Sequence, residues 1–266
     1  MNAKSMESFN VCQLEQVENK IPAGLPSLGK IIKGWHLSDL VIISSQLRKG
    51  GRTLLAMSIA RNLTVDYRIP VAYFSLKLPT ALLRKRLIEM ETGHTIKTLD
   101  DKTRQDMAKL MEAPLFIDDT PELSIFDLRE KVKRLTNEHG IKLVIVDYVQ
   151  LMGGYEGTGS RDCWLENVVK TLKDIASEFR VVVMALDKMY RPANDMVNTR
   201  DFPKVAGAKK YADVMLEYCP NKPERSGSLD WDAEIVVIKN NKGDVGSCFV
   251  KVTNKYRLHD ANTYHD

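Results

Sequence analysis

Short apolar runs rich in β-branched residues recur along this chain, and segments with helical periodicity separate them. Five such runs are Leu40 to Ser44, Val71 to Ser75, Leu115 to Ile117, Leu143 to Asp147 and Val181 to Leu186. Strands without polar alternation are typical of sheets that are buried on both faces. Between the runs, apolar residues at helical spacing mark residues 54–63, 83–90, 125–135 and 165–175. The alternation predicts an α/β fold with a mostly parallel central sheet flanked by helices, in which ligands bind at the carboxyl ends of the strands.

The C-terminal part of the chain has a different pattern. Residues 215–219, 234–240 and 248–253 are strand-like, and no helical segment separates them. Turn-forming stretches join them at 220–228 and 241–246. This arrangement predicts an antiparallel C-terminal extension of the sheet. At the other end of the chain, residues 7–19 have the spacing of a short amphipathic helix.

Composition excludes several classes of protein. The 266 residues carry 39 Lys and Arg against 35 Asp and Glu, and 44% are hydrophobic, which argues against a disordered chain and against a polyelectrolyte tail. No long uncharged apolar run occurs, so we expect no membrane span and no membrane partner. The four cysteines form no C-x-x-C pair, which favours free thiols in a reducing cytoplasm. We expect one domain at residues 21–258, with an N-terminal arm or linker helix at 1–20 and a tail at 259–266.

Several segments together resemble one protein family. They are Ile21 to Lys30 with the following Gly34 to Ile43, Ala113 to Arg129 (A-P-L-F-I-D-D-T-P-E-L-S-I-F-D-L-R) and Ile145 to Met152 (I-V-D-Y-V-Q-L-M). In sequence and order they are similar to the ATPase domain of DnaB-type bacterial replicative helicases. The resemblance implies a RecA-like P-loop NTPase core that uses ATP and Mg²⁺, assembles into rings and acts on single-stranded DNA. The family's helical N-terminal domain is expected to be missing here.

The stretch Gln46 to Thr53 (Q-L-R-K-G-G-R-T) lies between a buried strand and a helix, the position of a phosphate-binding loop. Such loops use glycines for close backbone approach, a lysine on the phosphates and a hydroxyl on Mg²⁺. Gly50, Gly51 and Thr53 suit these roles, whereas Gln46 and Arg52 replace the first glycine and the lysine. Arginine keeps the charge of an ammonium but not its geometry, so we expect weak or absent binding of ATP and Mg²⁺. Without its place between a buried strand and a helix, the same stretch would be interpreted as an ordinary basic loop.

The resemblance places a catalytic glutamate just after the second strand, where this chain has Lys77 in F-S-L-K. A protonated lysine cannot act as a general base, so hydrolysis should fall by several orders of magnitude if no other carboxylate substitutes. Asp147, at the end of a later strand, is kept and would hold Mg²⁺ together with Thr53. We hypothesise that Lys77 pairs with Asp147 and takes the metal's place. Taken alone, Lys77 fits a solvated surface lysine equally well.

Two further motifs of the family are altered. The position of the sensor glutamine holds Lys188, in A-L-D-K. Lys239 matches the trans-acting lysine that contacts nucleotide, but Asn241 stands at the arginine-finger position, where the arginine is worth about 10³- to 10⁵-fold in rate. The neighbouring Lys242 is a candidate for partial replacement. With the changes in the loop and at Lys77, these departures predict an ATPase fold that has lost efficient hydrolysis.

Two segments correspond to the DNA-binding loops of the family, residues 153–161 and 189–210. The cations of the second segment are Arg191, Arg200, Lys204, Lys209 and Lys210. Together with Tyr190 and Phe202 they suit weak binding of a single-stranded backbone by charge and base stacking. A solvated loop fits the segment about as well, because Asp195 and Asp201 dilute its charge.

Three functions stay open on the sequence alone. The leading hypothesis is a degenerate replicative-helicase subunit that binds single-stranded DNA, copies of itself, or a replicative helicase or another replication protein. The alternative is an active ATP-driven helicase motor in which Arg52 serves as the loop cation and Glu89 or Glu91 as the base. A third is an ATP-independent accessory that mimics a helicase subunit in order to load or inhibit it. The oligomeric state, monomer or ring, is open for each.

Overall fold

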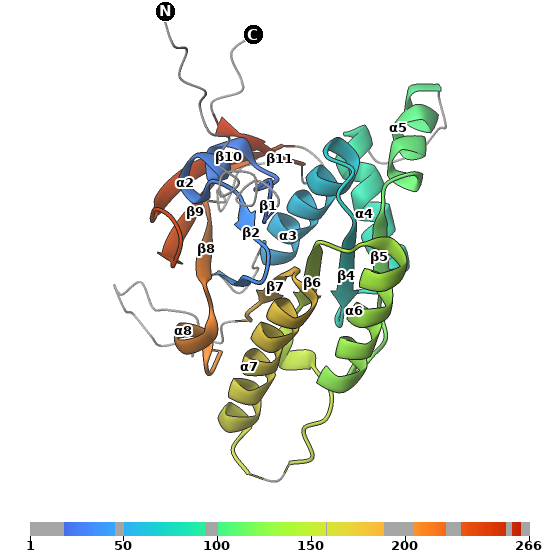
Figure 1. The fold of residues 1–266 in the computed structure, drawn as a ribbon. Coiled ribbons are helices and arrows are strands. Elements are labelled where there is room, and N and C mark those ends of the chain that lie inside the picture. Colours follow the sequence, from blue (N-terminus) through green and yellow to red (C-terminus); the bar gives the residue numbers. More distant parts are fainter. Residues whose placement is uncertain are drawn as a thin grey trace, which may run out of the picture.

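A computed structural model describes residues 19–45, 51–93, 101–157, 159–188, 205–221, 230–253 and 257–261. Its main sheet has nine strands in these parts of the chain (Figure 1). In spatial order they are β11 (Arg257–Asp260), β10 (Gly246–Thr253), β9 (Trp231–Asn240), β8 (Val214–Asn221), β3 (Leu40–Ser44), β7 (Val182–Leu186), β6 (Leu143–Asp147), β4 (Val71–Ser75) and β5 (Leu115–Asp118). The strands from β8 to β5 are parallel to one another, and the pairs from β8 to β11 are antiparallel. The predicted sheet is confirmed.

Helices cover both faces of the parallel strands, as Figure 1 shows. The helices of the described residues are α2 (Pro26–Ile32), which packs on β9 and β10, α3 (Arg52–Arg61) with a π-helical continuation (Asn62–Asp66), α4 (Thr80–Thr92), α5 (Asp101–Met111), α6 (Ile125–His139), α7 (Arg161–Phe179) and α8 (Ala208–Tyr211). A 3-10 turn (Val149–Leu151) follows β6, and a two-stranded ribbon pairs β1 (Lys20–Ile21) with β2 (Trp35–His36). None of the described helices is long and apolar enough to cross a membrane.

Successive residues of one strand enter two different hydrophobic cores. Val41 and Ile43 of β3 pack into the core that α2, α3 and α4 cover. Leu40 and Ile42 of the same strand pack into the core beneath α6 and α7. Because side chains alternate across a strand, a strand with no polar residue must be covered on both faces. The uninterrupted apolar runs of the sequence therefore follow from the two-sided cover.

The structure differs from the sequence-based expectations in the details of several elements. β8 is antiparallel to β9, as expected of the extension, but it also pairs parallel with β3 and so belongs to the central sheet as well. Helix α5 was not predicted, because its sequence D-K-T-R-Q-D-M-A-K-L-M carries few apolar residues to mark a buried face. The helix expected at residues 7–19 lies almost entirely outside the described residues. β11 extends to Asp260, two residues past the boundary drawn from the sequence.

Candidate nucleotide site

The carboxyl ends of the parallel strands bring polar side chains to one edge of the sheet. Ser75, the last residue of β4, is the register partner of Asp147, the last residue of β6. Asp187 follows β7 directly, and Glu217 lies in β8 opposite Ser44 of β3. All of these side chains are buried. A row of buried polar groups at the strand ends is the position where open α/β sheets bind ligands.

Gly51 directly precedes helix α3 and needs to be glycine for two reasons. Its backbone is left-handed, with φ 63°, which costs free energy for any residue with a β-carbon. A β-carbon there would also collide with the ring of Tyr218 of β8, which is fully buried. Helix α3 therefore starts at Arg52 with its N-terminal backbone N–H groups at the sheet edge, as anion binding requires. The two other loop residues predicted for the site, Gln46 and Gly50, lie outside the described residues.

The Arg52 side chain extends toward the buried polar groups at the carboxyl ends of the strands. Its Nη1 is inaccessible to solvent and finds no hydrogen-bond partner among the described residues. Burial lowers the pKa of the guanidinium, and the negative charges of Asp187 and Asp147 act in the opposite direction. An arginine keeps its charge under such conditions, so a buried N–H without an acceptor is costly. The oxygen of an anionic ligand would satisfy it.

Asp147 is held by two hydroxyl groups of the chain. Its exposed fraction is only 3%, and burial raises the pKa of the carboxyl group. Hydrogen bonds from Thr53 and Tyr73 lower that pKa and oppose the effect of burial, and the Tyr73 hydroxyl donates to Oδ2 over 2.9 Å. Sequence reasoning missed Tyr73, although a hydroxyl-bearing residue inside the run V-A-Y-F-S was a visible signal.

The hypothesised ion pair between Lys77 and Asp147 is wrong. Lys77 lies two residues beyond the paired end of β4, and its side chain is exposed. No ion pair joins it to Asp147 in the part of the chain that the structure describes, and its charge is the weakest of the influences on that carboxyl group. Arg52 acts on Asp147 more strongly than Lys77 does. The buried carboxylate of Asp147 therefore takes its hydrogen bonds from neighbouring hydroxyl groups at the ends of the strands, and not from the side chain of Lys77 in the loop after β4.

Asp187 is a second buried acid that sequence reasoning did not single out. It is 0% exposed, and it accepts hydrogen bonds from Nε2 of Gln150 and from the backbone N–H of Val205. Gln150 also accepts from the backbone N–H of Lys188 over 3.1 Å. The Lys188 side chain is exposed, with Nζ 5.5 Å from the centre of the Tyr148 ring. Asp187 thus supplies the largest electrostatic stabilisation of the Arg52 charge, whereas Lys188 points to the surface.

The candidates at the end of β9 all have partners within the chain. Lys239 donates to the backbone carbonyls of Lys209 and Ala212. The side-chain amide of Asn241 donates weakly to Asp213, over 3.4 Å. Lys242 forms an ion pair with the buried Asp39, with Nζ 2.5 Å from Oδ1. A role for any of them at a neighbouring subunit's nucleotide would require these contacts to break.

The comparison with known families decides the identity of the fold. The model of the DnaB-like helicase C-terminal domain matches residues 20–260, which is nearly the whole chain. This chain belongs to the DnaB-like helicase family. It is 31% identical over 256 residues to a probable replicative DNA helicase of Trieres chinensis and 28% identical over 258 residues to the replicative DNA helicase DnaB of Geobacillus stearothermophilus. Each alignment covers 89% of this chain and 56% of the relative, so the chain spans about half the length of these relatives.

Solved structures show the same fold. One solved ATPase domain matches with a TM-score of 0.82 and 20% identity, and the match covers 95% of this chain and 97% of that domain. A DnaB-like replicative helicase, studied with its interactions with primase, has a TM-score of 0.80 with 20% identity over 97% of this chain and 67% of its own. The RecA-like P-loop ATPase fold is therefore established for this member of the DnaB-like family, with antiparallel strands at its C-terminal side.

The DNA-binding candidates of this DnaB-like domain are only partly described. Arg191, Arg200 and Lys204 lie outside the described residues, as does most of their segment. Lys209 and Lys210 form part of the short helix α8 and are exposed. Lys210 pairs with Glu166 of α7 over 3.2 Å and lies 4.9 Å from the ring centre of Tyr211. In the other segment, the Arg161 guanidinium lies 5.7 Å from the ring centre of Tyr155, so a cation again lies beside an aromatic ring.

Proposed function

We propose that this chain is a DnaB-like ATPase-domain homologue that acts in DNA replication by binding rather than by hydrolysing ATP. The observation that carries the proposal is the composition of the sheet edge. A half-buried arginine with an inaccessible Nη1 and two buried aspartates occupy it, and the second residue after β4 is an exposed lysine instead of a carboxylate. The site keeps groups that attract phosphate and has lost the group that activates water.

Weak nucleotide binding is consistent with these residues. Three features favour an anion at the same edge: the N-terminus of α3, the close-packed backbone at Gly51, and Nη1 of Arg52, which has no hydrogen-bond partner among the described residues. The fit to Mg²⁺ is poorer. Asp147 already accepts hydrogen bonds from Thr53 and Tyr73, which leaves fewer of its lone pairs for a metal or a metal-bound water. When bound in such sites, Mg²⁺ neutralises charge on the phosphates.

We expect hydrolysis to be lost because the position after β4 that the family resemblance assigns to the general base holds Lys77. Lys77 is an ammonium at neutral pH and cannot accept a proton from water. The alternative motor required Glu89 or Glu91 as the base. Glu91 is committed to a buried ion pair with Arg61, with Oε2 2.6 Å from Nε. The motor hypothesis therefore rests on Glu89 of α4 alone.

For partners, we propose single-stranded DNA, bound weakly, and other subunits of the replication machinery in the cytoplasm. Support for DNA comes from the exposed Lys209 and Lys210 and from the Arg161 and Tyr155 pair. Support for self-association or binding of a replicative helicase comes from family membership. An accessory that loads or inhibits a helicase would use the same scaffold, and the choice between these modes needs a partner to be tested.

One titration experiment tests the proposal. Nucleotide is added to the full chain with and without Mg²⁺ and a single-stranded oligonucleotide, while heat of binding, hydrolysis and molar mass are recorded. We expect weak ADP and ATP binding with little dependence on Mg²⁺ and no DNA-stimulated hydrolysis. Hydrolysis that DNA stimulates and that Thr53→Ala abolishes would establish the motor instead. Thr171→Ala is the matched control, because this threonine lies in the middle of α7 and bonds only its own helix backbone in the described structure.

A further inference from the structure

The first turn of α3 offers its backbone N–H groups to an anion, but no side chain of the described residues caps it. Gly51, the residue before the helix, has no side chain that could bond these N–H groups, and the first turn contains no acidic residue. The N–H groups are therefore left for a ligand, which suits phosphate. The lack of a cap also leaves the start of the helix without a local anchor. Contacts with the rest of the fold must set its position.

Contacts from two strands reach this turn. On one side, Thr53 donates a hydrogen bond to Asp147 of β6. On the other side, Gly51 lies against the ring of Tyr218 of β8. The three atoms nearest to a β-carbon built on Gly51 all belong to that ring, and the Cδ1 atom would be only 3.0 Å away. The backbone at the start of α3 therefore rests directly on an aromatic ring.

Tyr218 is itself firmly held. Its side chain is 0% exposed and packs in the core that α2, α3 and α4 cover, and its hydroxyl group is inaccessible to solvent. Burial raises the pKa of Tyr218 to about 12, although the side chain of Trp231 of β9 acts in the opposite direction. The phenol is therefore neutral at physiological pH and does not repel an anion nearby. A buried ring with few rotamers is a rigid support for the backbone that lies on it.

We propose that Tyr218 is a positioning residue for the anion site, which consists of the first-turn N–H groups of α3 and the Arg52 guanidinium. The ring fixes Gly51, whose carbonyl accepts from the backbone N–H of Leu55 over 2.9 Å, so that Gly51 and the first turn move together. Tyr218 acts through Gly51 and touches no ligand. The inference rests on the proposed binding of nucleotide. A tyrosine that only fills the core would change stability and leave phosphate affinity per folded molecule unaltered.

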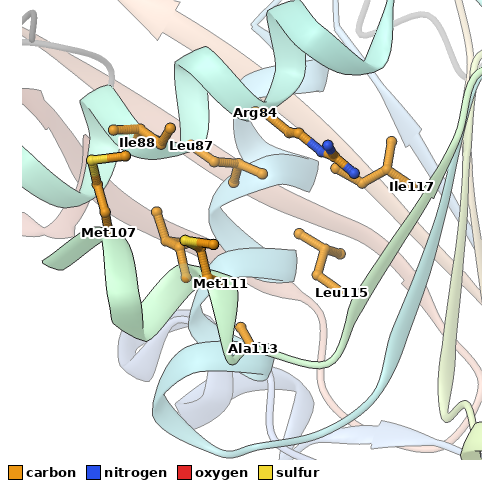
Figure 2. Close-up of a pocket in the computed structure, with 9 residues that line it drawn as sticks. Arg84, Leu87, Ile88, Met107, Met111, Ala113, Leu115 and Ile117 are labelled. Atoms are coloured by element: carbon orange, nitrogen blue, oxygen red, sulfur yellow. The ribbon is translucent and has the colours of Figure 1, made fainter. Parts of the chain in front are cut away.

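A cation elsewhere in the chain provides a control for anion binding outside this site. Figure 2 shows Arg84 of α4 extending along a pocket of about 310 Å³ that is lined by leucine, isoleucine and methionine side chains. None of the lining residues belongs to the first turn of a helix, so an anion would find one guanidinium and no free backbone N–H groups there. Arg84→Ala should therefore leave phosphate affinity unchanged.

The test titrates pyrophosphate, and separately ADP, into the full chain without Mg²⁺. Tyr218→Met replaces the rigid ring with a flexible side chain that still fills the core, so this variant should fold. Tyr218→Phe keeps the ring. Ile235→Ala is the matched control for core damage, because Ile235 is the register partner of Tyr218 on β9 and is 0% exposed in the same core. Chemical denaturation of each variant gives the folded fraction to which affinity is referred.

We expect Tyr218→Met to weaken the binding of pyrophosphate and ADP about tenfold, because a loosely held site pays for its own ordering when the ligand binds. Tyr218→Phe and Ile235→Ala should each stay within about twofold of the natural chain. Without ligand, amide hydrogen exchange at residues 52–55 should be faster in Tyr218→Met and unchanged in Ile235→Ala.

A substitution from the other side of the contact tests the same coupling. Gly51→Ala introduces the β-carbon that meets the Tyr218 ring, and it should weaken pyrophosphate binding about tenfold in the natural chain. In the Tyr218→Met background the same change should cost less than about threefold, since a flexible methionine can move aside. Gly93→Ala is the control for backbone strain, because Gly93 is also left-handed, with φ 74°, and a β-carbon there would have no atom within 4 Å.

The outcomes separate this inference from the proposed function. If the natural chain binds neither pyrophosphate nor ADP, the proposed nucleotide binding fails and the role of Tyr218 fails with it. If the natural chain binds them and Tyr218→Met binds equally well, only the role of Tyr218 is overturned. The same holds if Ile235→Ala or Arg84→Ala loses as much affinity as Tyr218→Met, or if the losses from Gly51→Ala and Tyr218→Met simply multiply.

Discussion

The interior of the parallel strands and their carboxyl ends differ in what they require of a side chain. Within β6, Leu143 to Val146 are fully buried and need only to be apolar and of suitable size. One residue later, Asp147 depends on particular atoms, the hydroxyl groups of Thr53 and Tyr73. An interior of this kind tolerates many sequences, whereas a site changes its chemistry with one substitution. A DnaB-like scaffold can therefore persist after its hydrolytic residues have been replaced.

The largest effect on the free energy of unfolding is expected from a substitution in the hydrophobic interior. Phe74 of β4 is fully buried and packs into the core beneath α6 and α7. Phe74→Ala should lower the free energy of unfolding by about 3–5 kcal/mol, because the lost burial and the cavity both destabilise. Chemical denaturation measures this loss. Phe126→Ala is the matched control, since Phe126 is 77% exposed and its removal should change stability by no more than about 0.5 kcal/mol. Equal losses in the two variants would contradict the burial of Phe74 in the core beneath α6 and α7.

A second prediction separates structural acids from catalytic ones. Glu91 is 8% exposed and pairs with Arg61, which is 7% exposed. Glu91→Gln should destabilise the fold by roughly 2–4 kcal/mol, because it leaves a buried guanidinium only partly compensated by Asp66. Any residual ATP hydrolysis per folded molecule should stay unchanged. Denaturation and a hydrolysis assay on the same preparation give both values. A stable variant that has lost hydrolysis would return Glu91 to the role of base.

The sequence predicted the interior well for a physical reason. Runs such as L-V-I-V-D and V-A-Y-F-S leave few alternatives to a strand covered on both faces, and the observed strands begin and end at the predicted residues. The site at the carboxyl ends of the strands was predicted less well, because its contacts join residues from different strands. Nothing local to Lys77 indicated that Asp147 would be satisfied by Tyr73, and nothing local to Asp187 indicated that it would act on Arg52. The role of the edge residues in nucleotide binding stays a prediction.

A third variant changes a residue of the candidate site at the carboxyl ends of the strands. Lys77 is exposed, so Lys77→Glu should change the free energy of unfolding by no more than about 0.5 kcal/mol. It returns a carboxylate to the position of the general base, and we expect ATP hydrolysis to rise about tenfold from its low level. The full gain expected of a base, about 10²-fold or more, should not be reached while Arg52 and Asn241 remain. Single-turnover hydrolysis measures the change, and Lys85→Glu on α4 controls for added negative charge.

The smallest effect concerns the free energy of unfolding, which the burial of the charged Asp147 carboxylate lowers. Burial raises the pKa of its carboxyl group in the folded chain, so the folded state holds the proton more tightly than the unfolded state does. As pH rises from below the ordinary carboxyl pKa through the raised pKa, the folded state therefore loses stability relative to the unfolded state. Asp147→Asn removes this loss, because the amide does not ionise and still accepts a hydrogen bond from Tyr73.

The variant should accordingly be more stable than the natural sequence at pH 7, by up to about 1 kcal/mol, and the difference should shrink at pH 4. Denaturation curves at the two pH values measure it. Asp174→Asn, at an exposed position of α7, should show no such pH-dependent difference. A variant that is less stable than the natural sequence at pH 7 would mean that the attraction of Arg52 outweighs the burial of Asp147. A gain would show that this chain keeps a buried aspartate at the sheet edge at the expense of its own stability, as is expected of a residue retained for ligand binding rather than for folding.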